Sequence, residues 1–88
     1  MNVEFLNKFS KDLNKLSDPQ IRASLIKVIE QIESANNLST IQNLKKINGH
    51  YSVYRIKLGD YRIGIFVVGK VVEMVRMVHR KDIYKAFP

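Results

Sequence analysis

The sequence predicts an α+β fold, in which a short N-terminal strand and a helical hairpin precede a three-stranded antiparallel meander that packs on the helices. Apolar residues recur at helical spacing as far as Asn37. After Asn48-Gly49, three runs alternate between apolar and polar residues, and short glycine-containing turns separate them. The length of 88 residues is that of one small domain, which we expect to span residues 1–88.

The N-terminal part of the chain predicts one strand and a first helix. Val3 and Phe5 alternate with polar neighbours, which is typical of a short strand. From about Asn7, the apolar residues fall on one face of a helix: Phe9, Leu13 and Leu16.

A second helix is predicted to begin at "SDPQ". Pro19 suits the first turn because its missing N–H would be unpaired there anyway, and Asp18 or Ser17 can cap the helix. The apolar stripe of this helix contains Ile21, Leu25, Val28, Ile29 and Ile32. Asn36-Asn37 marks its end. Two short helices with little between them predict a helical hairpin.

The alternating runs "YSVYRIKL" and "YRIGIFVV", followed by a third run, "VVEMVRMV", predict the meander. Which face the third run buries is ambiguous, because both of its sides carry apolar residues. Gly59-Asp60 separates the first two, and Gly69-Lys70 supplies a glycine-first turn of type II′ before the third. The helices need an apolar partner, and one face of this sheet is the only large one available. The other face is expected to be open to solvent or to a ligand. Arg55 and Lys57 share one strand face, whereas the position of Arg62 depends on the register.

The formal net charge of +7 is concentrated in the second half of the chain. In residues 1–44, five cations balance five acids, whereas residues 45–88 carry ten cations against Asp60, Glu73 and Asp82. Such asymmetry indicates a polyanionic partner, most often nucleic acid and sometimes an acidic protein or a membrane surface. The alternative is a basic protein whose charge serves only solubility.

The sequence lacks cysteine, which excludes disulfides and thiolate zinc sites as supports for the fold. It also has no apolar run of transmembrane length and no signal-peptide pattern. These features predict a cytoplasmic protein that is stabilised by an apolar core and has no membrane partner.

Several kinds of catalytic site find no support in the sequence. Only two histidines are present, and His50 is expected in a loop after Asn48-Gly49, so no serine–histidine–acid set stands out. The acids of the second half lack metal-ligand spacing, and there is no phosphate-cradling glycine loop. We therefore expect no metal and no cofactor. The remaining candidates are cationic or phenolic: Arg55, Lys57, Arg62, Arg76, His79, Arg80, Lys81 and Tyr84.

Such side chains suit the metal-free cleavage of RNA through its own 2′-hydroxyl. The 2′-oxygen attacks the adjacent phosphorus and the 5′-oxygen leaves. An enzyme must remove one proton, donate another and stabilise negative charge on the phosphoryl oxygens. Arginine suits the last task because its planar fork binds two oxygens and stays charged. Histidine can move protons, and so can tyrosine where neighbouring cations favour the phenolate.

Each candidate also has an ordinary structural interpretation. Arg55 and Lys57 alternate with apolar residues, as on any solvated strand face. Arg62 follows a turn, where a lone arginine is usually solvated. Tyr84 can pack with its hydroxyl at the surface, and His79 can fill a strand end. Only their occurrence together, on one sheet and on the segment that follows its last strand, favours a functional interpretation.

Two motifs carry a resemblance to a known family. "YRIKLGDYRIGIFV" (residues 54–67), followed by "VRMVHRKDIYKAF" (residues 75–87), resembles the RelE/ParE superfamily of bacterial toxins. "LKKINGHYSVYRIK" (residues 44–57) resembles that family's usual entry into its sheet, and the helical hairpin fits as well. The resemblance therefore covers nearly the whole chain.

The resemblance implies a RelE-like fold and a toxin of a type II toxin–antitoxin pair, neutralised by a cognate antitoxin protein. RelE-like members are endonucleases that cut mRNA in the ribosomal A site without metal. By this resemblance, Arg55 and Lys57 contact RNA, and Arg62 stabilises the phosphate. His79 or Arg80 supplies a second catalytic group. Tyr84 stacks on a base or takes part in proton transfer. The resemblance gives no role to Arg76 or Lys81, and we expect Lys81 only to add positive charge for RNA binding.

Two alternatives remain from the sequence. ParE-like members share the fold but poison DNA gyrase and are not nucleases. In addition, some members carry a glutamate base near the start of the sheet, and none lies between Glu33 and Glu73 here. The presence of Arg62, His79, Arg80 and Tyr84 favours the RelE-like branch. A non-catalytic RNA-binding module is the third possibility.

Overall fold

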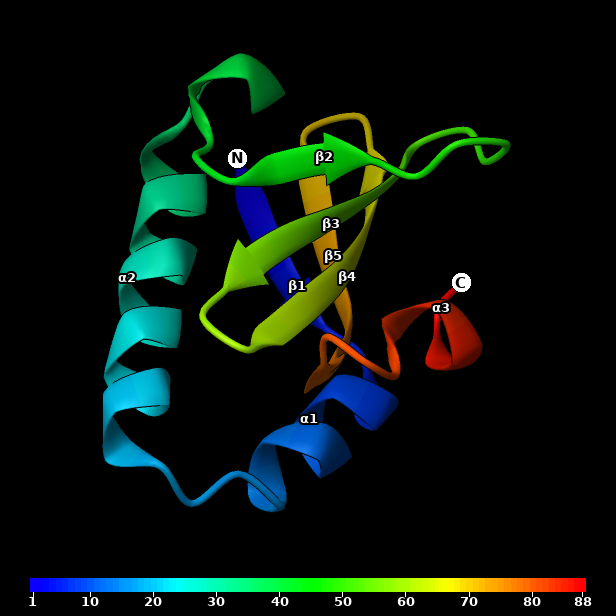
Figure 1. The fold of residues 1–88 in the computed structure, drawn as a ribbon. Coiled ribbons are helices and arrows are strands. Elements are labelled where there is room, and N and C mark those ends of the chain that lie inside the picture. The colour runs from blue at the N-terminus through cyan, green and yellow to red at the C-terminus, as the bar shows by residue number, and fades with distance from the viewer.

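The computed structural model describes all 88 residues, which form a five-stranded mixed sheet with three α-helices. Figure 1 shows the arrangement. The elements in chain order are β1 (Asn2–Phe5), α1 (Asn7–Asn14), α2 (Pro19–Ser34), the 3-10 turn η1 (Leu38–Thr40), β2 (Leu44–Lys46), β3 (Val53–Leu58), β4 (Tyr61–Val68), β5 (Val71–His79) and α3 (Ile83–Ala86). No helix combines the length and the apolar composition that crossing a bilayer requires. The predicted α+β class is confirmed.

The strands lie in the order β1-β5-β4-β3-β2, and every pair is antiparallel except β1 with β5. The predicted meander is therefore the centre of the sheet. Gly59 and Gly69 each open a two-residue turn with a φ of 58°. This is the left-handed region, where glycine meets no steric cost. The two edge strands, β1 and β2, extend the predicted meander on either side.

The two predicted helices are present, but the expectation that they lie side by side as a hairpin is wrong. In Figure 1, α1 runs along the bottom of the molecule and α2 rises along its side, so that they meet at a wide angle. Both helices pack their apolar stripes on the sheet instead of on each other. Arg22 of α2 stabilises the connection between the two helices, because its guanidinium donates hydrogen bonds of 2.9 Å to the carbonyls of Leu13 and Leu16. Asp18 caps α2 through the N–H groups of Gln20 and Ile21, as predicted.

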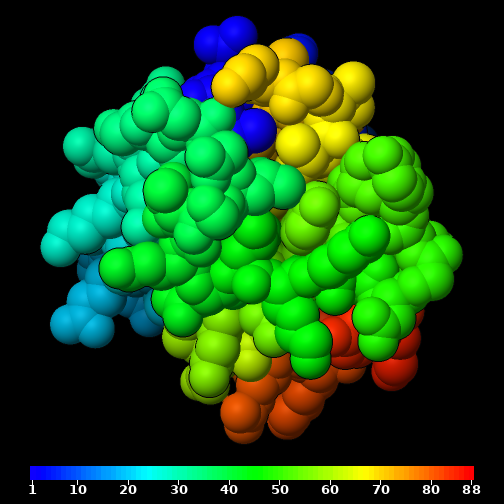
Figure 2. All heavy atoms as spheres, turned by 90° about the horizontal axis from the view of Figure 1, so that it is seen from above, coloured from blue at the N-terminus to red at the C-terminus, as the bar shows by residue number.

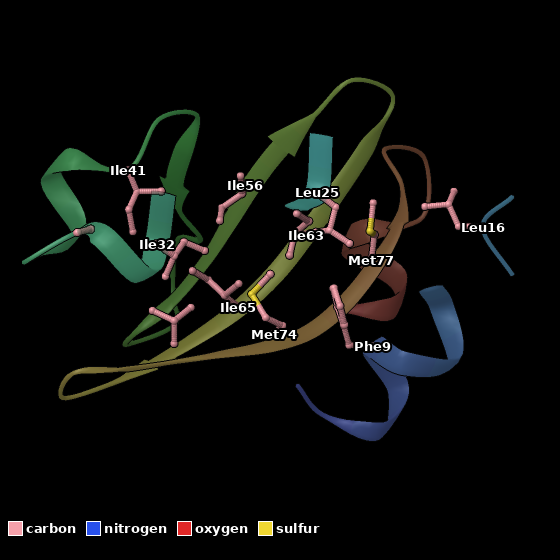
Figure 3. Close-up of a cluster of buried hydrophobic side chains, with 12 residues drawn as sticks. Phe9, Leu16, Leu25, Ile32, Ile41, Ile56, Ile63, Ile65, Met74 and Met77 are labelled. Atoms are coloured by element: carbon pink, nitrogen blue, oxygen red, sulfur yellow. The ribbon is translucent and has the colours of Figure 1, made fainter. Parts of the chain in front are cut away.

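The main core lies between the helices and one face of the sheet, as Figure 3 shows. The helices contribute Phe9, Leu25 and Ile32, which are almost fully buried. The sheet contributes Ile56, Ile63, Ile65, Met74 and Met77 from its three central strands. Because side chains alternate along a strand, the residues between these positions point to the opposite face.

The opposite face is half covered, so the expectation that it is open to solvent or ligand is correct for only part of it. The C-terminal segment crosses it and buries a second, smaller core of Ile47, Val53, Ile83 and Phe87. Phe87 stacks on Phe66 with ring centroids 5.4 Å apart. It also lies directly over Gly64, where an added Cβ would stand 2.5 Å from its Cγ atom. Because Gly64 has no side chain, the Phe87 ring can pack directly against the strand at this position.

A largely buried ion pair joins α1, β5 and the C-terminal segment. Asp12 accepts hydrogen bonds from Nε and Nη2 of Arg76, at 2.7 and 3.1 Å, and from the N–H of Met77, at 2.9 Å. Arg76 also donates from Nη1 to the carbonyl of Ala86 at 3.4 Å. The hydrogen bond with Asp12 raises the pKa of Arg76, an effect that burial opposes. Arg76, a cationic candidate from the sequence, thus has a structural role.

Replacing Asp12 with alanine is expected to lower the free energy of unfolding by about 2–3 kcal/mol, because a partly buried guanidinium, 22% exposed, loses its partner. The Asp12 side chain is only 9% exposed, so water cannot replace it fully. Urea unfolding followed by circular dichroism measures the change. Asp18→Ala is the matched control. It removes an exposed helix cap, and the expected cost is about 1 kcal/mol. Equal effects of the two variants would contradict the assigned role of the ion pair.

Candidate functional site

Four cations form a continuous surface on the half of the opposite face that α3 leaves open. Arg55 of β3 stands opposite Lys45 of β2, and Lys57 of β3 stands opposite Arg62 of β4. Residues directly opposite each other share a face of the sheet. Their strand neighbours Ile56 and Ile63 point into the main core, so these cations point away from it. We call Lys45, Arg55, Lys57 and Arg62 the cation track.

The guanidinium of Arg62 is held on one side and free on the other. Its Nη1 donates hydrogen bonds of 2.9 Å to the carbonyls of Gly59 and Tyr61, within the β3–β4 turn. Its Nε and Nη2 have no protein partner. The fork is therefore oriented by the turn while two donors remain for a ligand such as a phosphate. This arrangement costs little reorganisation when an anion binds.

No acid neutralises the cation track. The two ion pairs of the molecule are Arg76 with Asp12 and Arg80 with Asp60, and neither includes a track residue. Arg55 donates from Nη1 to the carbonyl of Asn43 at 3.3 Å, which leaves its charge uncompensated. Four neighbouring positive charges without counter-charges create a local potential that attracts polyanions.

His79 lies on the other face of the sheet from Arg62. It is the register partner of Tyr61, which packs on the main core, and the two rings are 5.9 Å apart in an edge arrangement. Its Nδ1 accepts a hydrogen bond from the N–H of Lys81 at 3.2 Å. It lines a separate pocket of about 260 Å³ together with Asp12. The structure does not bring His79 to the cation track.

Arg80, in contrast, meets the turn that orients Arg62. Its N–H donates to the carbonyl of Asp60 at 2.8 Å, and its Nε lies 4.0 Å from Oδ1 of Asp60. Its side chain is 59% exposed, so the contact with Asp60 is a loose surface pair. Of the two alternatives for the second catalytic group, the structure places Arg80 on the turn shared with Arg62. Lys81 follows it and is exposed.

Tyr84 stands on α3, where 70% of its surface is exposed. It lines a groove of about 410 Å³ between the β2–β3 connection and the C-terminal segment, with Lys45 among the other lining residues. Tyr84 therefore lies at the Lys45 end of the cation track. Figure 2 shows the C-terminal residues, in red, beside the green residues of this part of the chain.

The groove also contains Lys46 and His50, which the sequence did not mark as site residues. His50 lies in the predicted loop, and nothing local signals that this loop meets α3. The two segments are brought together by the second core, in which Ile47 and Val53 contact Ile83. Only the tertiary packing reveals this part of the site.

Comparison with known proteins agrees with the fold and with the family resemblance. Residues 3–84 match the model of a family described as the ParE toxin of the type II toxin–antitoxin system, parDE. Toxin RelE3 of Methanocaldococcus jannaschii is 40% identical over 89 residues, which cover 100% of both chains.

Two solved structures are similar over most of their length. The toxin of the RelB-RelE antitoxin–toxin complex from Methanococcus jannaschii is 40% identical, with a TM-score of 0.81 over 97% of this chain and 99% of that chain. A chain of the intact Escherichia coli RelBE toxin–antitoxin complex is 26% identical, with a TM-score of 0.66 over 89% and 94%. The family model and the relative of equal length together show that this chain belongs to the RelE/ParE superfamily of type II toxin–antitoxin toxins.

Proposed function

We propose that this chain is an endoribonuclease that cleaves mRNA on the ribosome by 2′-hydroxyl attack, needs no metal, and thereby inhibits translation in the cytoplasm. The observation that supports it is the acid-free cation track, in which Arg62 is oriented by the β3–β4 turn and keeps two donors free. A phosphodiester is the ligand that such a fork fits best.

In the proposed reaction, the 2′-oxygen bonds to phosphorus while the bond from phosphorus to the 5′-oxygen breaks. Arg62 donates to the non-bridging oxygens, where negative charge develops in the transition state. Arg80, which follows β5 and contacts the β3–β4 turn through Asp60, supplies a second positive charge. Arg55 and Lys57 hold the neighbouring backbone phosphates. The 2′-oxygen loses a proton and the departing 5′-oxygen gains one. Tyr84 is the residue that we assign to one of these proton transfers or to stacking on a base.

Two names from the comparisons point to different branches of the superfamily. The matching family model is described as a ParE toxin, whereas the relative of equal length is named Toxin RelE3. A 40% identity over the whole of both chains is a closer relationship than membership in a broad family. It favours the RelE-like branch, and a ParE-like gyrase poison without nuclease activity is the second candidate.

A cognate antitoxin is part of the proposal. Solved toxins of this fold occur in RelB-RelE antitoxin–toxin complexes. The cation track here is exposed and lacks counter-charges, so a segment that supplies acids and apolar anchors would complement it. Such a segment would exclude RNA from the same surface.

The test is to incubate the purified chain with ribosomes programmed with a defined mRNA and to map the new 5′ ends by primer extension. Cleavage by the 2′-oxygen leaves 5′-hydroxyl ends, which a polynucleotide kinase labels without prior dephosphorylation. A gyrase supercoiling assay is run in parallel. Inhibited supercoiling together with intact mRNA would replace the nuclease proposal by the gyrase alternative.

A further inference from the structure

Besides Tyr84, the groove beside the cation track contains side chains that the proposed cleavage step does not use. Lys46 and His50 line it from the β2–β3 connection, and Tyr84 and Phe87 line it from the C-terminal segment. Its volume is about 410 Å³, and neither Lys45 nor Lys46 forms an ion pair. The groove is therefore concave, positively charged and partly aromatic.

A second tyrosine stands at the rim of this groove. Tyr51 is 91% exposed, so it contributes almost nothing to either core. Nζ of Lys46 lies 5.7 Å from the centroid of its ring. Gly49 and Ser52 adopt left-handed conformations on either side, with φ of 81° and 59°. These residues turn the connection sharply, and Figure 1 shows that it projects away from the sheet.

We propose that this groove is a nucleobase-binding subsite for single-stranded RNA, which holds a nucleotide adjacent to the cleaved one. The inference rests on the proposed function, since it extends the same RNA-binding surface. Exposed tyrosine rings are stacking platforms for unpaired bases, and nearby lysines bind the backbone between them. Tyr51 and Tyr84 would provide the rings, and Lys45 and Lys46 the charges.

The position of Lys45 connects the subsite to the catalytic arginine. Lys45 of β2 pairs with Arg55 of β3, which pairs with Gly64 of β4. Arg62 lies two residues before Gly64 on β4 and points to the same face of the sheet. With strands about 4.8 Å apart and residues rising about 3.4 Å each, the Cα atoms of Lys45 and Arg62 are about 12 Å apart. An extended RNA strand with its scissile phosphate at Arg62 can therefore reach the groove with a neighbouring nucleotide.

Single-stranded RNA fits the groove better than an acidic peptide does. An acidic segment would use the lysines, but its carboxylates have no planar face to stack on the exposed ring of Tyr51. A base, in contrast, has a flat face for each ring and a phosphate for each cation. The exposed Tyr51 is the feature that distinguishes the two partners.

The test measures equilibrium binding of a fluorescent six-nucleotide single strand, made entirely of 2′-deoxynucleotides, which cannot undergo 2′-hydroxyl cleavage. Tyr51→Ala is expected to weaken binding by about tenfold, the effect of losing one stacked base, and Tyr51→Phe to keep it. Lys46→Ala is expected to reduce the slope of log affinity against log salt by about 0.7, whereas Tyr51→Ala leaves the slope unchanged. Lys8→Ala, at an exposed position of α1, removes the same charge away from the groove and the cation track and serves as the control.

Cleavage assays on the same variants separate this inference from the proposed function. If the subsite exists, Tyr51→Ala raises KM for mRNA cleavage and leaves kcat unchanged. If the parent chain binds the oligonucleotide through Tyr51 but cuts no mRNA, the nuclease proposal fails and the subsite stands. Equal binding by Tyr51→Ala and Lys8→Ala overturns the subsite. So does a glutamate-rich peptide that binds this groove when the oligonucleotide does not.

Discussion

The Arg62→Ala variant is expected to cleave ribosome-bound mRNA about 10²–10³-fold more slowly than the parent chain, with little change in KM. In the proposed reaction, the free donors of Arg62 bind the phosphoryl oxygens that gain charge in the transition state, and loss of one such donor has an effect of this size. Single-turnover cleavage on programmed ribosomes measures the rate of the chemical step. The fold should be unaffected, because Arg62 bonds only to carbonyls of its own turn.

Two further variants make this expectation specific. Lys57→Ala removes a positive charge directly opposite Arg62, and it should raise KM while changing kcat by less than about tenfold. Tyr84→Phe keeps the ring and loses the hydroxyl, so a large fall in kcat would assign proton transfer to Tyr84, and an unchanged kcat would assign stacking. A normal rate in Arg62→Ala would remove Arg62 from the reaction and would leave the cation track as a binding surface only.

Gly64→Val is expected to release the C-terminal segment from the sheet. The new Cβ would stand 2.5 Å from Cγ of Phe87, which real structures do not tolerate, so the aromatic ring must leave its seat. Expulsion of Phe87 also removes the anchor of α3 and empties the second core. We expect a loss of about 3–5 kcal/mol in the free energy of unfolding, the range for removing a buried phenylalanine. Urea unfolding measures this loss, and limited proteolysis detects the released segment.

A double-mutant cycle checks whether the clash with Phe87 is what destabilises variants of Gly64. Gly64 has no left-handed φ, so alanine at this position should otherwise stabilise the strand by about 0.5–1 kcal/mol. We therefore expect Gly64→Ala to destabilise the parent chain and to be neutral or stabilising in the Phe87→Ala background. A similar destabilisation in both backgrounds would show that the ring is not what Gly64 accommodates.

The helices and strands that could be predicted from the sequence are those long enough to show an apolar stripe or an alternation of apolar and polar residues. The three central strands have six to nine residues each, and α2 has sixteen, so their alternation and apolar stripe stand out. β2 has three residues, which is too few to show a clear alternation. α3 has four residues, about one helical turn, which is too few to show an apolar stripe. The parallel pairing of β1 with β5 joins the two ends of the chain, and local patterns carry no information about it.

Part of the candidate site could likewise be predicted from the sequence, and part could not. The residue types of Arg55, Lys57 and Arg62 could be selected from the sequence, and a tight turn between β3 and β4 then places them on one face. The separation of His79 from Arg62 follows from the register of β4 with β5. The groove around Tyr84 could not be predicted, because it forms only where the β2–β3 connection meets a segment more than thirty positions later in the chain.

The parallel pairing of β1 with β5 also determines when the molecule can be completed during synthesis. Asn2 finds its partner only when Val71 has left the ribosome, and Phe5 waits for Met74. The main core needs Met74 and Met77 as well, and the cation track lies on strands that depend on that core. Contacts so distant along the chain form late. A nascent chain therefore cannot assemble the cation track until residues 71–77 have left the ribosome, and a chain terminated before them never assembles it.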